Sequence, residues 1–276
     1  MALPPETLAS LPRVSAGPFD KAAPHWGYYV VDTLDCPPFT MFTNNDCPAA
    51  GNFLNHGRFE PGSLKLWCAL ARTATAIIDI GANVGVFALA AASLRSDIGI
   101  EAYEPNPYAF ARLRMHKQVN RFKQMMDRPH AMGEVTGVID IAWAKRSWGP
   151  ISSGTALGAH PEKEDGVERS IAWMTRLDAV VPTLGARGLM KIDVEGAEIV
   201  VLKGMGKLVE ERPDIILETF HPQACDLYNQ TFLPLGYRVF TIDEASGRLE
   251  ETGRLKPASQ TSVNGFNQFL SVRGQP

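Results

Sequence analysis

Strand-like and helix-like segments alternate from residue 76 to residue 272, and this alternation constrains the fold more than any other feature. The run Ala76-Ile-Ile-Asp-Ile80 is almost continuously apolar, which is typical of a parallel strand buried on both faces. Such alternation predicts an α/β protein, with a doubly wound parallel sheet covered by helices on both faces. We expect strands at 76–80, 98–103, 189–193, 214–218, 237–242 and 266–272, and a weaker one near 124–126 or 128–132. We expect helices at 61–72, 86–94, 108–119, from about 195 to about 211, and at 223–233.

Two regions depart from this rhythm. Residues 134–172 contain the run 137–143 and are predicted to form a β-rich insertion. The first 60 residues hold eight prolines and two strand-like runs, at 28–32 and 39–43, which argues against long helices there. We therefore expect an N-terminal extension, residues 1–60, which could act as a lid, ahead of a catalytic domain at 61–276.

Composition removes several classes of partner. The chain has 27 Lys and Arg against 30 Asp and Glu and no basic block, unlike proteins that bind the phosphate backbone of nucleic acids. We find no apolar stretch of about 18 residues and no basic start followed by an apolar run. The expectation is a cytoplasmic protein with a small-molecule ligand, no nucleic acid and no membrane span. Its oligomeric state is not predicted, although a homodimer would be compatible with it.

Polar residues cluster where the predicted strands end, which is where doubly wound sheets bind ligands. Asp79 is followed by the loop Gly81-Ala82-Asn83-Val84-Gly85, whose glycines would let the backbone approach a ligand closely. Glu104 and Asn106 follow the next strand, and a carboxylate there can accept both hydroxyls of an adenosine ribose. The spacing of the loop is Gly-x-x-x-Gly, not the three-glycine pattern of pyrophosphate binding. This favours S-adenosylmethionine over a dinucleotide, because Asp79 suits the ammonium group of a methionine moiety.

Three motifs carry a family resemblance: Ile78-Asp-Ile-Gly-Ala-Asn-Val-Gly85, Glu104-Pro-Asn-Pro107 and Lys191-Ile-Asp-Val-Glu-Gly-Ala-Glu198. Together they resemble the FkbM family of S-adenosylmethionine-dependent methyltransferases, over residues 57–272. The resemblance implies a seven-stranded Rossmann-like sheet whose last strand is antiparallel, and O-methylation of a hydroxyl, often on a sugar or natural product. It assigns the methionine part of the cofactor to the loop residues Asp79, Gly81, Asn83 and Gly85. It assigns the ribose to Glu104 and the adenine amine to Glu134, and we expect Glu60 to close the cofactor pocket.

The acceptor end is predicted from three further residues. Asp193 ends the strand nearest the transferring methyl group in this fold, so it is the first candidate for a base or a hydroxyl-binding group; capping the next helix is the alternative. Glu195 and His221 are the other catalytic candidates. Asp193, Glu195 and His221 could together bind a divalent metal, but no spacing requires one and no metal is predicted.

Other functions stay open at this point. An N-methyltransferase acting on a small molecule or peptide would need less help from a base. An NAD-type oxidoreductase is disfavoured by the two-glycine loop. A cofactor-binding protein without catalysis is the remaining alternative.

Overall fold

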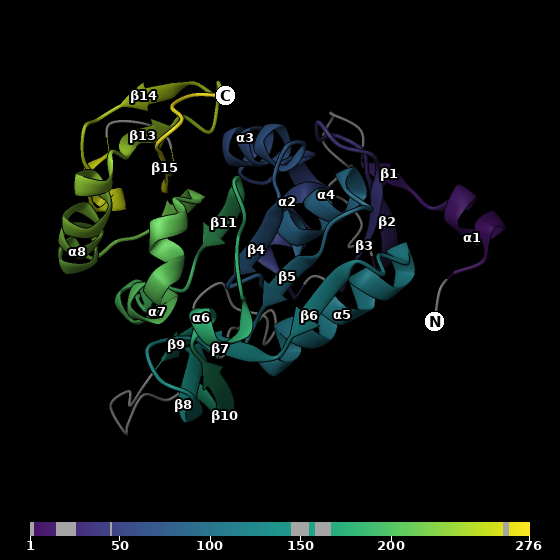
Figure 1. The fold of residues 1–276 in the computed structure, drawn as a ribbon. Helices are drawn as coiled ribbons and strands as arrows, with labels where there is room; N and C mark the ends of the chain where they lie inside the picture. The colour runs from purple at the N-terminus through teal and green to yellow at the C-terminus, as the bar shows by residue number, and fades with distance from the viewer. Residues whose placement is uncertain (1–2, 15–25, 45, 145–154, 158–166, 262–264) are drawn as a thin grey trace.

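The computed structural model describes residues 3–14, 26–44, 46–144, 155–157, 167–261 and 265–276. Its centre is a large sheet that, over these residues, runs in the order β14-β13-β15-β12-β11-β4-β5-β6 (Figure 1). Strands β4, β5, β6, β11 and β12 are parallel, whereas β15 is antiparallel to both of its neighbours, β12 and β13. The strands are β4 (Ala76–Ile80), β5 (Ile100–Tyr103), β6 (Met125–Arg128), β11 (Gly188–Ile192), β12 (Asp214–Glu218), β13 (Arg238–Ile242), β14 (Leu249–Glu251) and β15 (Asn267–Ser271).

The doubly wound sheet with an antiparallel last strand is confirmed, and it has one strand more than the seven expected. The extra strand is β14, which pairs with β13 after a tight turn. In that turn the Gly247 N–H donates to the Asp243 carbonyl and the Ser246 N–H donates to the Asp243 carboxylate. Three residues, two of them glutamates, give no strand periodicity, so the sequence did not reveal β14.

Helices cover the two faces of the sheet as two separate layers (Figure 1). Alternate residues of one strand serve the two layers: Ile77 packs with the first and Ile78 with the second. The first layer holds α3 (Pro61–Ala71), α4 (Val86–Leu94) and α5 (Pro107–Asn120). The second holds α6 (Leu177–Val180), α7 (Glu198–Met205), η1 (Gly206–Glu211), α8 (Pro222–Phe232) and η2 (Leu233–Leu235). A short turn, η3 (Ala258–Gln260), precedes β15.

The β-rich insertion is confirmed as a second, four-stranded sheet. Its order is β7-β10-β8-β9, from β7 (His130–Met132), β8 (Gly137–Ala144), β9 (Thr155–Leu157) and β10 (Val167–Thr175). Both alternatives for the weak strand are realised, because β6 joins the large sheet and β7 joins the insertion. Pro129 separates the two strands and lacks the N–H that a continuous ladder would need.

The N-terminal residues form a small sheet, β1-β2-β3, with two helices. Its elements are α1 (Pro5–Ser10), β1 (Arg13–Val14), β2 (Gly27–Val31), β3 (Phe39–Thr43) and α2 (Pro48–His56). Helix α2 was not expected and begins with Pro48 in its first turn, where a missing N–H costs nothing. The extension shares the core of the α3–α5 layer through Tyr29, Met41 and Phe53. A boundary at residue 60 and a lid function stay predictions.

One buried histidine side chain forms hydrogen bonds both to this extension and to the loop after β4. His116 of α5 accepts a hydrogen bond from the Phe42 N–H at 2.9 Å through Nε2, and its Nδ1 lies 2.8 Å from the Val84 carbonyl. Nearby, Arg112 forms an ion pair with Asp46 at 2.9 Å. The side chain of His116 thus links the extension to the segment that the sequence assigns to cofactor binding.

Within the described residues, no helix is both long and apolar enough to cross a membrane.

Candidate active site

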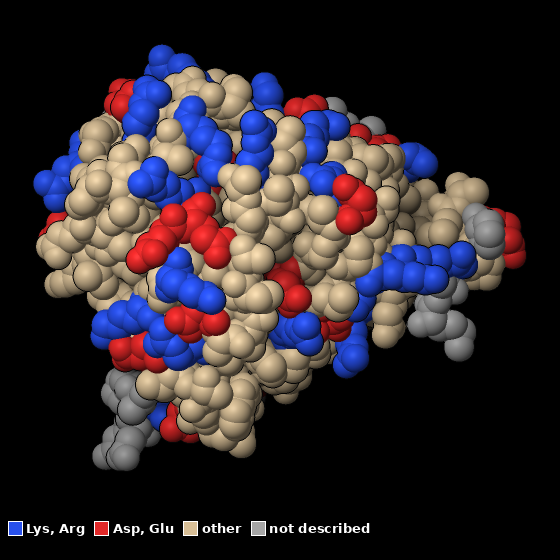
Figure 2. Space-filling model, in the orientation of Figure 1, with Lys and Arg blue, Asp and Glu red and all other residues tan. Residues whose placement is uncertain are grey.

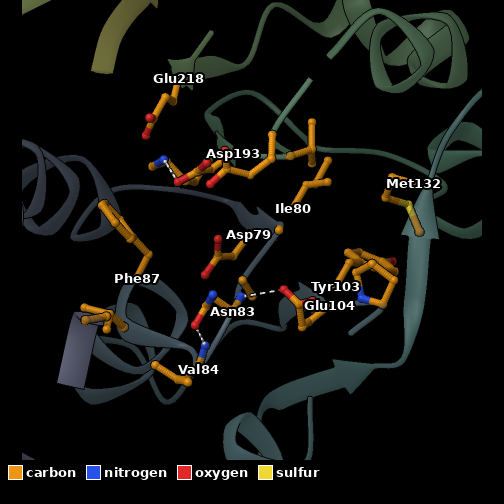
Figure 3. Close-up of a pocket in the computed structure, with 18 of the residues that line it drawn as sticks. Asp79, Ile80, Asn83, Val84, Phe87, Tyr103, Glu104, Met132, Asp193 and Glu218 are labelled. Carbon is orange, nitrogen blue, oxygen red and sulfur yellow. Dashed lines mark hydrogen bonds and ion pairs between the residues drawn. The ribbon is translucent and has the colours of Figure 1, made fainter. Parts of the chain in front are cut away.

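A cavity of about 240 Å³ opens at the carboxyl ends of β4, β5, β11 and β12. Figure 3 shows Glu218 and Asp193 at one end of it, Tyr103, Glu104 and Met132 at the other, and Asp79 between them. Among the residues that the structure describes, six carboxylates but a single lysine line the cavity, together with aromatic and apolar side chains. The polar and charged lining residues are Glu60, Asp79, Asn83, Tyr103, Glu104, His130, Lys191, Asp193, Glu195 and Glu218.

The loop after β4 is packed directly against the end of β11. Gly81 has a φ of +80°, and a Cβ atom there would lie 1.7 Å from the carbonyl oxygen of Asp193. The Asp193 N–H in turn donates to the Ile80 carbonyl at 3.0 Å. Glycine is therefore required at position 81 for both its conformation and its lack of a side chain. Gly85 (φ +95°) plays a similar packing part against Leu113, and it does not line the cavity.

Asp79 is buried in the middle of the cavity wall, with 1% of its surface exposed. Its Oδ2 accepts a hydrogen bond from the Ala88 N–H, in the first turns of α4, at 3.0 Å. Burial raises the pKa of Asp79 to about 7, although Lys191 and the Ala88 N–H act in the opposite direction. A cationic ligand beside Asp79 would favour the ionised carboxylate.

Glu104 is held by backbone groups on both sides. One oxygen accepts from the Asn83 N–H and the other from the Asn106 N–H, each at 2.8 Å. Burial raises the pKa of Glu104 to about 7, against the effect of these two N–H groups. Each carboxylate oxygen has two lone pairs, so Glu104 retains acceptor capacity for ligand hydroxyls.

Asn83 and Asn106 both lie next to Glu104, but only Asn83 lines the cavity. Asn83 lines it, next to Ala82, and has a left-handed backbone with φ +50°. Asn106 is completely buried, and its side chain caps α5 by accepting from the N–H groups of Tyr108 and Ala109. Its position explains how Glu104 is oriented, and we assign it no direct ligand contact.

At the opposite end of the cavity, acids surround one buried lysine. Lys191 is 1% exposed, its Nζ lies 3.0 Å from Asp193 Oδ2, and it stands 5.1 Å from the centre of the Phe87 ring. Burial alone would lower the pKa of Lys191, but Asp193, Glu60 and Glu218 outweigh it and raise that pKa. Lys191 is therefore a cation.

The carboxylates around Lys191 come from three separate elements. Oxygen atoms of Glu60, Asp193 and Glu218 lie within 4.8 Å of one another. Burial raises the pKa of Glu60 to about 7 and that of Glu218 to about 9. These are the acids that the fold gathers, and Lys191 is the positive charge among them; Asp193, Glu195 and His221 are not gathered in this way within the described residues.

Three residues predicted from the sequence lie in different settings. Glu195 lines the cavity from an exposed turn with φ +51°. His221 is exposed at the start of α8 and does not line the cavity, although its Nε2 lies close to Gly196. Glu134 also lies outside the cavity lining and forms an ion pair with Lys203 at 2.9 Å. A role for Glu134 at adenine therefore has no support from its position, and the roles of Glu195 and His221 stay predictions.

Sequence reasoning missed Lys191 and Glu218 as functional residues. Both were visible as parts of strand-end clusters, since Lys191 stands two residues before Asp193 and Glu218 ends β12. Their positions at the ends of neighbouring strands were the evidence for a role in the site. His221 was chosen instead because histidine is a common catalytic residue type.

The fold and the cavity are compatible with a Rossmann-like, S-adenosylmethionine-dependent methyltransferase, and the comparison with protein families shows this class. The family model described as the methyltransferase FkbM domain matches residues 79–239, and the chain belongs to this family. Among curated protein sequences, none matches the chain significantly.

Solved structures give distant similarities. A SAM-dependent methyltransferase from Agrobacterium tumefaciens has 12% identity and a TM-score of 0.44, covering 91% of this chain and 71% of that one. A precorrin-6y C5,15-methyltransferase from Geobacter metallireducens has 11% identity and a TM-score of 0.39, covering 84% and 90%. An O-methyltransferase from Thermotoga maritima has 10% identity and a TM-score of 0.34, covering 85% and 73%.

Proposed function

We propose that the protein transfers a methyl group from S-adenosylmethionine to a hydroxyl oxygen of a small molecule. The observation that carries this proposal is the charge of the cavity, which among the described residues is lined by six carboxylates and one lysine, at the strand ends of a methyltransferase-family fold. A ligand with net positive charge fits such a set of side chains, and S-adenosylmethionine carries a sulfonium and an α-ammonium against one carboxylate.

The residues present fit the cofactor in one orientation. Glu104 would hold the ribose hydroxyls, with Tyr103 and Met132 beside the adenosine. The loop after β4, which packs closely against Asp193 at Gly81, would face the methionine part with its backbone. Asp79 would face the ammonium group. When bound, S-adenosylmethionine supplies an electrophilic methyl group on sulfur, and the protein's task is to position the acceptor and exclude water.

Asp193 is the residue best placed to orient the acceptor hydroxyl. Its side chain is 26% exposed, it lines the cavity, and Lys191 fixes one of its oxygens. A carboxylate held by a buried ammonium is well suited to accept a hydrogen bond from a hydroxyl. Glu195, on the adjacent turn, is the second group available at this rim.

A small-molecule acceptor is supported by the distribution of surface charge. On the face shown in Figure 2, Lys and Arg are scattered and interspersed with Asp and Glu. A protein that binds a nucleic acid backbone would normally present a continuous basic surface. The cytoplasmic location stays a prediction.

Calorimetry with S-adenosylmethionine, S-adenosylhomocysteine and NAD tests the proposal. We expect both adenosyl ligands to bind and NAD to fail, and Asp79→Asn to weaken S-adenosylmethionine binding by about tenfold or more. Asp97→Asn is the matched control, because Asp97 is exposed and pairs with Arg95 far from the cavity. Binding of NAD alone would establish an oxidoreductase instead.

Turnover with labelled S-adenosylmethionine and a panel of hydroxylated and amino compounds then separates the remaining functions. Label found on oxygen supports the proposal, and label found only on nitrogen replaces it with N-methylation. Tight cofactor binding with no transfer to any acceptor would indicate a binding protein.

A further inference from the structure

A second cavity, of about 440 Å³, lies beside the first, and the two have Glu60 in common. Besides Glu60, it is lined by Glu244, Ala258, Phe266 and Asn267. The carboxylate of Glu60 belongs to both: one of its oxygens lies within 4.8 Å of Asp193 and Glu218, and Oε2 accepts from Asn267 Nδ2 at 2.8 Å. Glu60 thus stands in the wall between the two cavities.

The backbone at Glu60 is held in an unfavourable conformation. Its φ of +40° and ψ of 57° are left-handed, and it directly precedes Pro61. A left-handed residue that is not glycine costs free energy, and a following proline restricts it further. The fold nevertheless keeps Glu60 there, with Asn267 bonded to its carboxylate.

Asn267 provides an independent sign of a ligand. Its side chain is 2% exposed, and its Oδ1 accepts no hydrogen bond from the described part of the chain. Asn267 pairs with Glu218 across β15 and β12, so both side chains stand on the same face of the sheet. A buried amide oxygen without a donor is costly, and a ligand hydroxyl would satisfy it.

Exposed aromatic rings flank the same cavity. Phe266 lines it and is 55% exposed; its ring centre lies 5.4 Å from that of Phe220, which is 41% exposed. Two neighbouring phenyl rings at a cavity rim offer an apolar surface to a flat or ring-shaped ligand.

The charges around the second cavity select against anions. Its lining contains Glu60 and Glu244 and, within the described residues, no Lys, Arg or His. Glu244 is engaged with the start of α3, where it accepts from the N–H groups of Gly62 and Ser63.

We propose that the second cavity is the acceptor subsite, that it takes an uncharged hydroxylated ring, and that Glu60 is the catalytic residue that removes the hydroxyl proton. The proposal rests on the proposed methyltransferase function. The hydroxyl proton passes to the Glu60 carboxylate, an oxygen lone pair forms the O–CH₃ bond, and the S–CH₃ bond breaks with its electron pair left on sulfur.

Glu60 suits this step better than Asp193. Asp193 is bound to Lys191, whereas Glu60 contacts a neutral amide and faces the acceptor side. The raised pKa of Glu60, about 7, also matches that of an efficient base near neutral pH. The groups that face it are Lys191 from β11, Asp193 just after β11, Glu218 from β12, Glu244 after β13 and Asn267 from β15.

Ligand-observed NMR on the full chain, saturated with S-adenosylhomocysteine, tests the subsite. The probes are phenol and methyl β-glucopyranoside, with phenyl phosphate and glucose 6-phosphate as charged counterparts. We expect at least one neutral probe to bind about tenfold more tightly than its phosphate counterpart, and Phe266→Ala and Asn267→Leu to remove that binding. Trp26→Ala, which removes another exposed aromatic ring, should leave it unchanged. Failure of both neutral probes, equal binding of the phosphates, or binding unaffected by both cavity variants overturns the subsite.

Substitution of Glu60 tests the proton acceptor, with the best neutral acceptor from the panel. In Glu60→Gln we expect turnover to fall by about 10²- to 10⁴-fold, and the rise of kcat through about pH 7 to disappear. The Kd for S-adenosylmethionine should stay within about threefold. Glu60→Asp should restore part of the activity, and Glu251→Gln, on exposed β14, should change nothing.

The two proposals fail in different ways. If the wild-type chain does not bind S-adenosylmethionine, the methyltransferase function itself fails. If it binds and transfers methyl groups, but Glu60→Gln loses less than about tenfold in turnover, only the role of Glu60 is overturned.

Discussion

His116 offers the sharpest test of how the N-terminal extension is attached to the cofactor loop. The perturbation is His116→Phe, which keeps a ring of similar size but removes both hydrogen bonds, to the Phe42 N–H and the Val84 carbonyl. Leaving a buried donor and a buried acceptor unpaired costs about 1–3 kcal/mol each. We therefore expect the free energy of unfolding at neutral pH to fall by about 2–6 kcal/mol.

The pH dependence of this loss carries the more specific prediction. Burial lowers the pKa of His116 from 6.5 to about 4, and Arg112 acts in the same direction. A histidine kept neutral by the fold contributes stability that is complete above the unfolded pKa and declines as pH falls toward the folded pKa. At about 1.4 kcal/mol per unit, the contribution of His116 should grow by about 3 kcal/mol between about pH 4 and about pH 6.5.

Urea denaturation of the wild type and the variant, from about pH 4 to about pH 8, measures this contribution as a difference. Taking the difference is necessary because Asp79 and Glu104, whose pKa values are raised, contribute less to the free energy of unfolding as pH rises over the same range. Their contributions are the same in the wild type and the variant, so they cancel. His56→Phe is the control, since His56 is exposed, and we expect it to change the free energy of unfolding by less than about 1 kcal/mol. A wild-type-minus-variant difference that is flat with pH, or that grows as pH falls, would refute the reasoning.

Three further predictions concern the cavity itself. Gly81→Ala should abolish cofactor binding, because its Cβ would lie 1.7 Å from the Asp193 carbonyl oxygen. The control is Gly253→Ala, which is also at positive φ but has open space around it; its free energy of unfolding, measured by urea denaturation, should fall by only about 1 kcal/mol. Lys191→Met should lower the free energy of unfolding by about 1–3 kcal/mol, because Asp193, whose side chain is partly exposed, loses the buried ammonium group that binds it; no loss at all would contradict the assignment of Lys191 as a buried cation. Affinity for S-adenosylmethionine and for S-adenosylhomocysteine, which share the ammonium group and the ribose, should rise with pH up to about 7 as Asp79 and Glu104 ionise. Calorimetry should find this rise reduced in Glu104→Gln, and affinities independent of pH would count against these groups.

The parallel core of the sheet was predictable because its strands are buried on both faces. Consecutive residues such as Ile77 and Ile78 enter different cores, which produces an apolar run that no amphipathic helix or exposed strand would show. The loop after β4 was predictable for a related reason, since its glycines mark a backbone that passes very close to β11.

The acidic cluster around Lys191 and Glu60 could not be predicted in the same way. Glu60 and Asn267 are bonded to each other although 207 residues separate them in the sequence. Whether Lys191 is a surface charge or the centre of an acidic cluster depends on which strands become neighbours. Local patterns identify the strand ends, but only the strand order decides which of these ends share a cavity.

The place of β15 has a consequence for how the protein matures. Among the strands of the large sheet, β15 comes last in the sequence, yet it hydrogen-bonds between β12 and β13, which are made earlier. During synthesis the cofactor half of the sheet can assemble first, while β12 and β13 still expose open edges to other chains. Insertion of β15 closes those edges and brings Asn267 to the second cavity in the same event. Weakening this strand should therefore produce aggregation during biosynthesis rather than a slow enzyme.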